Sequence, residues 1–209
     1  MLRKLPIVAV FGSGSAVEAA SAALASEVGT MVAGLGAHLL TGGGYGVMAA
    51  AAEGFTAMQE RAGLSIGIVP RGHDSPFDTP NRDPQGRPYP NPFVELAIMT
   101  PLPPRAGDWR TTPTRNHINV LTADVILALP GGAGTRNELD MAAHYRDEAR
   151  RPREQRRTVL VGPIEAFTSE HRSLFVHASS VASARRYLLS VLAARGFAWC
   201  LEGIADAGP

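Results

Sequence analysis

The sequence predicts an α/β domain built as a single doubly wound, Rossmann-like parallel sheet with helices on both faces. Three observations support this fold class. Short apolar runs recur along the chain, helix-compatible segments separate most of them, and glycine-rich turns follow three of the runs. Strands that alternate with helices form crossover units, which assemble into a parallel sheet covered on both faces. Its 209 residues are expected to form one domain, residues 1–209.

The elements follow in chain order from these patterns. The predicted strands are the apolar runs at residues 7–11, 37–40, 64–69, 93–99, 124–129 and 158–161. The predicted helices are the segments 17–35, 47–62, 112–122 and 135–150 and an amphipathic stretch at 182–194, expected to pack on the sheet or on a partner subunit. A proline-rich insert at about 70–113 interrupts the alternation. Seven prolines between residues 70 and 92 prevent a helix, so this segment is expected to form a flap over the sheet edge, with 101–104 as a second irregular piece.

Composition excludes several classes of protein. No segment offers ~18 uninterrupted apolar residues, so no membrane span is expected, and Pro6 makes residues 1–11 a first strand rather than a signal peptide. The single cysteine, Cys200, excludes an internal disulfide and fits a reducing, cytoplasmic location. A net charge of +1 argues against a general nucleic-acid surface. The histidines show no zinc-ligand spacing, so neither a metal nor a resident cofactor is predicted.

Three glycine-containing turns are predicted at the carboxyl edge of the sheet, where ligands of parallel sheets bind. Glycine lets the backbone approach a ligand, and the free N–H groups of a helix start bind phosphate. The dinucleotide fingerprint lacks its third glycine and its ribose-binding acid, and no turn contains the lysine of a P-loop. A smaller phosphorylated ligand, such as a mononucleotide, is therefore predicted. The candidate binding residues are Gly12 and Ser13 of the first turn, Gly43, Gly44, Gly46 and Met48 of the second, and Pro130, Gly131, Gly132, Ala133, Gly134 and Thr135 of the third.

Two local patterns leave alternatives open. Thr135 and Glu138 stand in the T-x-x-E relation of a capping box, which would satisfy the first helical N–H groups without any ligand. Arg115 is expected in the first turn of a helix that Thr112 caps and Pro113 begins. A cation there opposes the helix dipole and so indicates an anionic partner. The alternative is a solvent-exposed arginine at a mild energetic cost.

The segment PGGAGTRNE, from Pro130 to Glu138, matches the motif P-G-G-x-G-T-x-x-E of the Lonely-Guy-like superfamily. Arg115 matches an arginine that the superfamily has upstream of this motif, and residues 42–48 match its glycine-rich turn ending in methionine. The sequence resembles this superfamily over about residues 5–165. Its members, often labelled lysine decarboxylases, include cytokinin-activating nucleotide phosphoribohydrolases and molybdenum-cofactor carrier-like proteins.

The resemblance implies that Arg115 and Glu138 form the catalytic pair of a hydrolase. Such an enzyme would cut the N-glycosidic bond of a nucleoside 5′-monophosphate, AMP or N6-modified AMP, releasing the free base and ribose 5-phosphate. It also implies a homodimer, for which the Ala-rich faces of 17–35 and 47–62 offer a surface. Asn116, where phosphoribohydrolases usually have lysine, is typical of the carrier-like branch. The alternatives are therefore a non-catalytic binder or carrier of a nucleotide or molybdopterin-type cofactor, and a regulatory ligand-sensing module.

Overall fold

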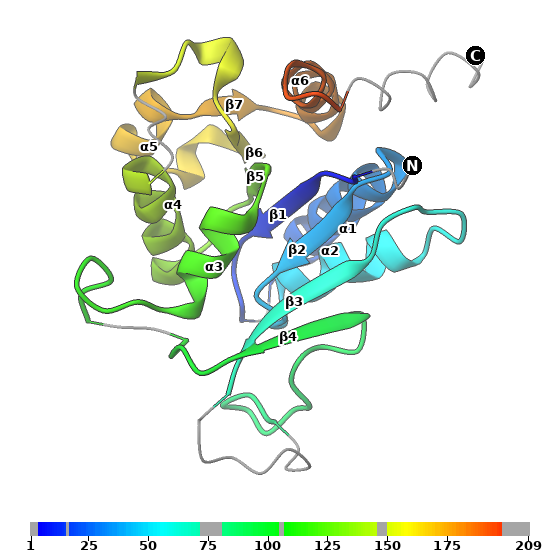
Figure 1. Ribbon diagram of the computed structural model, residues 1–209, viewed down its shortest axis with the longest axis vertical. Coiled ribbons are helices and arrows are strands. Elements are labelled where there is room, and N and C mark those ends of the chain that lie inside the picture. The colour runs from blue at the N-terminus through cyan, green and yellow to red at the C-terminus, as the bar shows by residue number, and fades with distance from the viewer. Residues whose placement is uncertain (1–3, 16, 72–80, 105–106, 146–149, 198–209) are drawn as a thin grey trace.

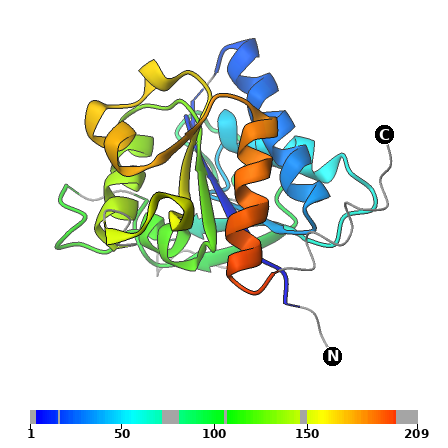
Figure 2. The ribbon, with the colours of Figure 1, turned by 90° about the horizontal axis from the view of Figure 1, so that it is seen from above.

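The computed structural model describes residues 4–15, 17–71, 81–104, 107–145 and 150–197, which form a seven-stranded sheet between two layers of helices (Figures 1 and 2). All strand pairs are parallel, in the order β4-β3-β2-β1-β5-β6-β7, so the predicted doubly wound sheet is confirmed. The chain order reverses between β1 and β5, which is where open α/β sheets bind ligands. The strands are β1 (Ile7–Phe11), β2 (His38–Thr41), β3 (Ser65–Pro70), β4 (Leu96–Thr100), β5 (Val125–Ala128), β6 (Thr158–Val161) and β7 (Val176–Ala178).

The helices divide between the two faces of the sheet. Helices α1 (Ala19–Gly34), α2 (Val47–Thr56) and α6 (Val181–Ala194) cover one face. Helices α3 (Arg115–Thr122), α4 (Ala133–Tyr145) and α5 (Ser169–Leu174) cover the other, and Figure 2 shows the two layers on opposite sides of the strands. In β1, Val8 and Val10 face the first layer while Ala9 and Phe11 face the second. A central strand buried on both faces is continuously apolar, as its sequence is.

Some predicted boundaries were wrong. Helix α2 ends at Thr56 rather than at residue 62, and β3 and β4 begin later than their apolar runs. Helix α4 begins at Ala133, two residues before the prediction, and residues 146–149 of its predicted extent lie outside the described part of the chain. Helix α5 and strand β7 were missed. Strand β7 has only three residues, with His177 in the middle, so it shows no apolar run.

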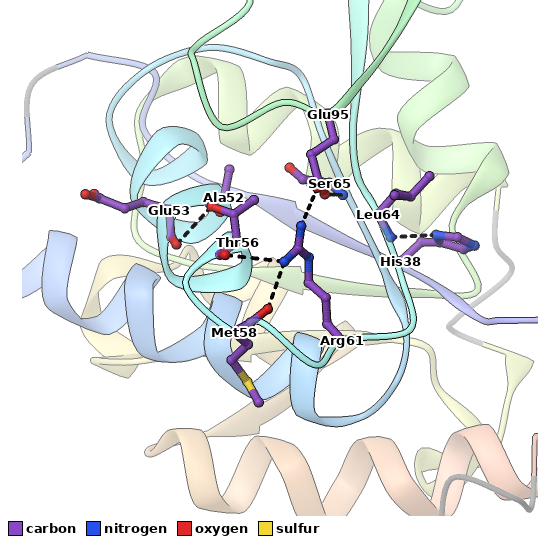
Figure 3. Close-up of polar contacts among 9 residues, drawn as sticks. All are labelled: His38, Ala52, Glu53, Thr56, Met58, Arg61, Leu64, Ser65 and Glu95. Atoms are coloured by element: carbon purple, nitrogen blue, oxygen red, sulfur yellow. Dashed lines mark hydrogen bonds and ion pairs between the residues drawn. The ribbon is translucent and has the colours of Figure 1, made fainter.

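The insert is partly a strand of the sheet. Strand β4 lies within it and forms one edge, with Leu96, Ile98 and Met99 exposed. Figure 3 shows the contacts of Arg61, Glu95 and Ser65 at its start. The Arg61 guanidinium donates to two carbonyls at the end of α2 and to Glu95, whose second carboxylate oxygen accepts the first N–H of β3 at 2.9 Å. Residues 72–80 and 105–106 of the insert lie outside the described residues.

Helices α1 and α2 pack closely on each other through their small residues. A Cβ added to Gly29 would stand 1.9 Å from the carbonyl oxygen of Ala51, and one added to Gly54 would stand 2.1 Å from that of Ser26. The two backbones are therefore in contact within one chain. Part of the small-residue surface that was expected to face a symmetry mate is used inside the protomer, and the homodimer stays a prediction.

Candidate functional site

The three glycine turns meet at the carboxyl ends of β1, β2 and β5. A Cβ on Gly131 would stand 3.0 Å from the backbone nitrogen of Ser13, and one on Gly46 would stand 2.4 Å from the Ser13 carbonyl oxygen. That carbonyl accepts the N–H of Val47 at 2.9 Å. Gly46 has φ +63°, in the left-handed region where a side chain is strained. Ser13 therefore lies between the second and third turns, at the switch point of the sheet.

Met48 lies over the first two turns. A Cβ on Gly44 would stand 2.5 Å from the Met48 methyl carbon, and one on Gly14 would stand 3.1 Å from it. Gly12 instead packs against Val47, because a Cβ there would lie 2.4 Å from that side chain. Gly12 therefore serves the contact between strand β1 and helix α2. Gly43, with φ +71°, shapes the second turn.

The third turn leads into the N-terminus of α4. The Arg136 N–H donates to the Gly132 carbonyl at 3.1 Å, so Gly132 stands at the cap position and Thr135 lies inside the first turn. The capping box of Thr135 with Glu138 is therefore wrong, because a capping side chain must precede the helix. The Thr135 hydroxyl is buried without a hydrogen-bond partner among the described residues, 2.1 Å from where a Cβ on Gly131 would stand.

The surface of this turn is open. Gly132, Ala133 and Gly134 are exposed, and a Cβ on Gly132 or Gly134 would meet no atom within 4 Å. Pro130, two residues after the end of β5, packs near Gly162 of the β6 turn, with its ring 3.6 Å from the Cβ position of that glycine. The N–H groups of the first turn of a helix have no acceptor within the helix. Gly132 at the cap position has no side chain to accept from these N–H groups, which suits them to bind an anion.

Helix α3 brings Arg115 to the same edge. Its N-cap is Thr114 rather than the predicted Thr112, because His117 completes the cap by accepting the Thr114 N–H on Nδ1 at 2.9 Å. The other imidazole nitrogen donates to the Trp109 carbonyl at 3.1 Å, so His117 has a structural role. Arg115 is the first helical residue, and its N–H donates to the Pro103 carbonyl at 3.0 Å.

The Arg115 guanidinium lies against the second glycine turn. A Cβ on Gly42 would stand 1.6 Å from its Nη1, so only glycine leaves room for it. Its Nε and Nη1 are buried without hydrogen-bond partners among the described residues. Buried donors are normally paired, and a cation in the first turn opposes the helix dipole. An anionic ligand would accept hydrogen bonds from the unpaired nitrogens, and its negative charge would offset the unfavourable interaction of Arg115 with the helix dipole.

Glu138 lies buried on α4 within the electrostatic reach of Arg115. Burial raises the pKa of Glu138 to about 7, against the Arg115 charge and the side-chain amide of Asn119, which both lower it. Asn119 is fully buried on α3, and its side-chain amide faces the Glu138 carboxyl. Asn119 was not among the predicted site residues. Its signal was a polar residue four positions after Arg115, on the same face of the helix.

Two hollows on the surface lie away from the glycine turns. One hollow of about 520 Å³ lies between α1, the end of α2 and the start of α6, and another of about 450 Å³ lies beside the end of α6. Neither is lined by the glycine turns, Arg115 or Glu138.

Within the described residues, no three His, Cys, Asp or Glu side chains are grouped to hold a metal ion. No helix among them combines the length and apolar character needed to cross a bilayer.

The arrangement is similar to that of known proteins. The molybdenum cofactor carrier protein of Chlamydomonas reinhardtii is 28% identical, with 91% of this chain and 99% of that chain covered and a TM-score of 0.63. The molybdenum cofactor binding protein of Rippkaea orientalis is 27% identical, with 90% and 98% covered and a TM-score of 0.64. DNA processing protein A of Helicobacter pylori shares the fold alone, at 14% identity and a TM-score of 0.57, with 88% of this chain and 80% of that chain covered.

No curated protein matches the sequence. The profile of the SLOG cluster4 family, in contrast, matches residues 5–161, which is more than half of the chain and includes all three glycine turns, Arg115 and Glu138. The chain belongs to the SLOG cluster4 family, within the Lonely-Guy-like superfamily that the PGGAGTRNE motif indicated.

Proposed function

We propose that the protein binds a phosphorylated small molecule, with the phosphate at the third glycine turn. The observation that carries this proposal is a set of buried polar atoms around the glycine turns that have no hydrogen-bond partner among the described residues: Nε and Nη1 of Arg115 and Oγ1 of Thr135. Each unsatisfied buried group costs about 1–3 kcal/mol. Such a cost is removed when a ligand supplies the missing hydrogen bonds.

Phosphate fits this site by charge and by geometry. The N-terminus of α4 offers unpaired N–H groups and the positive end of the helix dipole. Arg115 adds a fixed positive charge with planar donors that match a phosphate. Gly131 lies beside the Ser13 nitrogen, so a bound anion would contact the first and third turns together.

A molybdopterin-type cofactor carried as cargo is the first candidate ligand. Proteins described as carrier or binder of the molybdenum cofactor match about nine-tenths of this chain and nearly all of their own. Asn116, which follows Arg115, is also what the resemblance leads us to expect of a carrier. The phosphate of such a cofactor would bind at the turn, and the ring system would extend over the switch point of the sheet.

Hydrolysis of a nucleoside 5′-monophosphate is the second candidate, and Glu138 favours it. With a pKa of about 7, its carboxyl holds a proton in part of the molecules at neutral pH and so can accept or donate one. Water would add to the anomeric carbon of the ribose while the bond to the base breaks and the base leaves with a proton. The Glu138 carboxylate would position that water or stabilise the oxocarbenium character of the ribose.

Calorimetric titration with inorganic phosphate and AMP tests the binding site, and chromatography of free adenine tests hydrolysis. Arg115→Ala should weaken phosphate binding roughly tenfold or more, because a charged hydrogen-bonding partner is lost. Arg186→Ala is the control, since Arg186 is an exposed arginine on α6, on the opposite face of the sheet from α3. Absence of binding by both probes at millimolar concentration would contradict the proposal. Binding without release of adenine would favour the carrier.

A further inference from the structure

The proline-rich insert is hydrogen-bonded to three consecutive carbonyls of the second glycine turn. The Tyr89 hydroxyl donates to the carbonyl of Gly42 at 2.5 Å. The backbone N–H of Asn91 donates to the carbonyl of Gly43 at 2.8 Å, and its side-chain amide donates to that of Gly44 at 2.7 Å. This part of the insert is therefore a fixed neighbour of the site rather than a detached flap.

Tyr89 also lies beside Arg115. The hydroxyl binds the carbonyl of Gly42, the same residue against which the Arg115 guanidinium stands. Burial raises the pKa of Tyr89, and the Arg115 charge opposes this rise, as it does for Glu138. The guanidinium therefore lies within the electrostatic reach of a phenol on the insert and of a carboxyl on α4.

Such a position restricts the arginine side chain. A free arginine samples many rotamers, and binding an anion requires that it adopt one of them. A side chain that is held in its binding conformation loses less entropy when the ligand arrives. Because the Tyr89 hydroxyl donates its hydrogen bond to the Gly42 carbonyl, the lone pairs of its oxygen remain available as acceptors beside the Arg115 charge.

We propose that Tyr89 is a positioning residue for Arg115. Its hydroxyl fixes the Gly42 carbonyl and holds the guanidinium at the carboxyl edge of the sheet, which makes the proline-rich insert a wall of the phosphate site. This inference rests on the proposed phosphate binding and deepens it. By this proposal, the proline-rich insert contributes to the affinity of the site for its ligand.

Tyr45 provides a matched control. Its hydroxyl donates to the Pro88 carbonyl at 2.8 Å, and its ring stacks under the Arg87 guanidinium at 3.7 Å from the ring centroid. Tyr45 therefore joins the same glycine turn to the same insert. The Tyr45 hydroxyl makes its bond to Pro88, however, and not to the residue against which Arg115 lies. Tyr45→Phe thus removes the same chemical group from the same junction.

The experiment measures dissociation constants for inorganic phosphate and for AMP by calorimetry at one ionic strength. Tyr89→Phe should weaken binding of both about tenfold, the size expected when the loss of one hydrogen bond leaves Arg115 less well positioned. Tyr45→Phe should bind as the wild type does. In an Arg115→Lys background, Tyr89→Phe should cause no further loss, because the fork that it positions is gone. Both tyrosine variants should show similarly small decreases in melting temperature.

Three results would overturn the inference while leaving the proposed function in place. They are wild-type affinity in Tyr89→Phe, an equal loss in Tyr45→Phe, and a full further loss from Tyr89→Phe in the Arg115→Lys background. The second result would mean that both hydroxyls only anchor the insert. Wild-type protein that binds neither phosphate nor AMP would instead overturn the proposed function, and this inference with it.

Discussion

Glu138→Gln tests the electrostatics of the site through the stability of the protein. The Glu138 carboxyl is buried, and burial raises its pKa from the ordinary value of 4.5 to about 7. The folded protein therefore holds this proton more tightly than the unfolded chain does. The contribution of Glu138 to the free energy of unfolding is fully present below pH 4.5 and is lost as the pH rises towards 7.

The magnitude follows from the two pKa values. A difference between 4.5 and about 7 corresponds to a loss of about 3 kcal/mol above pH 7, at ~1.4 kcal/mol for each tenfold change in proton affinity. Glutamine has a similar shape and does not titrate. Glu138→Gln should therefore lie within ~1 kcal/mol of the wild type near pH 5 and exceed it by about 3 kcal/mol at pH 8.

Urea unfolding followed by circular dichroism at pH 5 and pH 8, without ligand and at one ionic strength, measures both values. Glu165→Gln is the control, because Glu165 is exposed and its removal should leave the stability of the protein unchanged within ~0.5 kcal/mol. The same pH dependence in Glu138→Gln and in the wild type would refute the reasoning. The Glu138 carboxyl would then be solvated in the native protein, and it would not lie buried beside Arg115.

Four further expectations concern activity, packing and assembly. If AMP is hydrolysed, Glu138→Gln should lower kcat on the order of 10²-fold with little change in AMP affinity, as release of adenine would measure. Gly131→Ala should abolish phosphate binding in calorimetry, because its Cβ would stand 2.1 Å from the Thr135 hydroxyl, whereas Gly34→Ala, in open space, should not. Arg61→Ala should lower the free energy of unfolding by about 1–3 kcal/mol in urea, since two carbonyls and Glu95 lose a donor; an unchanged midpoint would contradict this. Light scattering should show a homodimer at micromolar concentration, and a monomer would remove that prediction.

Local sequence patterns predicted much of the fold. The run of β1 is apolar at every position because both faces of a central parallel strand are buried, and this is visible without any structure. The convergence of the three glycine turns also followed from the sequence, since parallel strands end at one edge of a sheet. Strand β7 was missed because a strand of three residues has too short a sequence pattern to be recognised, and it forms through its pairing with β6.

The starts of the two helices at the site were misplaced from the sequence. The T-x-x-E pattern at Thr135 was correct as a pattern and wrong as a cap, because the helix begins at Ala133 and encloses the threonine. The start of α3 was misplaced because His117, and not an acidic residue, completes the cap at Thr114.

The sequence by itself therefore determined the α/β sheet, the glycine turns, the motif that ends at Glu138 and the arginine upstream of it, Arg115. Only the tertiary structure decided that Arg115 fits into the space left by Gly42, and that Tyr89 of the insert donates a hydrogen bond to the Gly42 carbonyl. Glycine spacing and helix periodicity act over a few residues along the chain and can be read from it. The meeting of a helix start, a turn and an insert more than twenty residues apart depends on packing across the whole sheet, which no local pattern encodes.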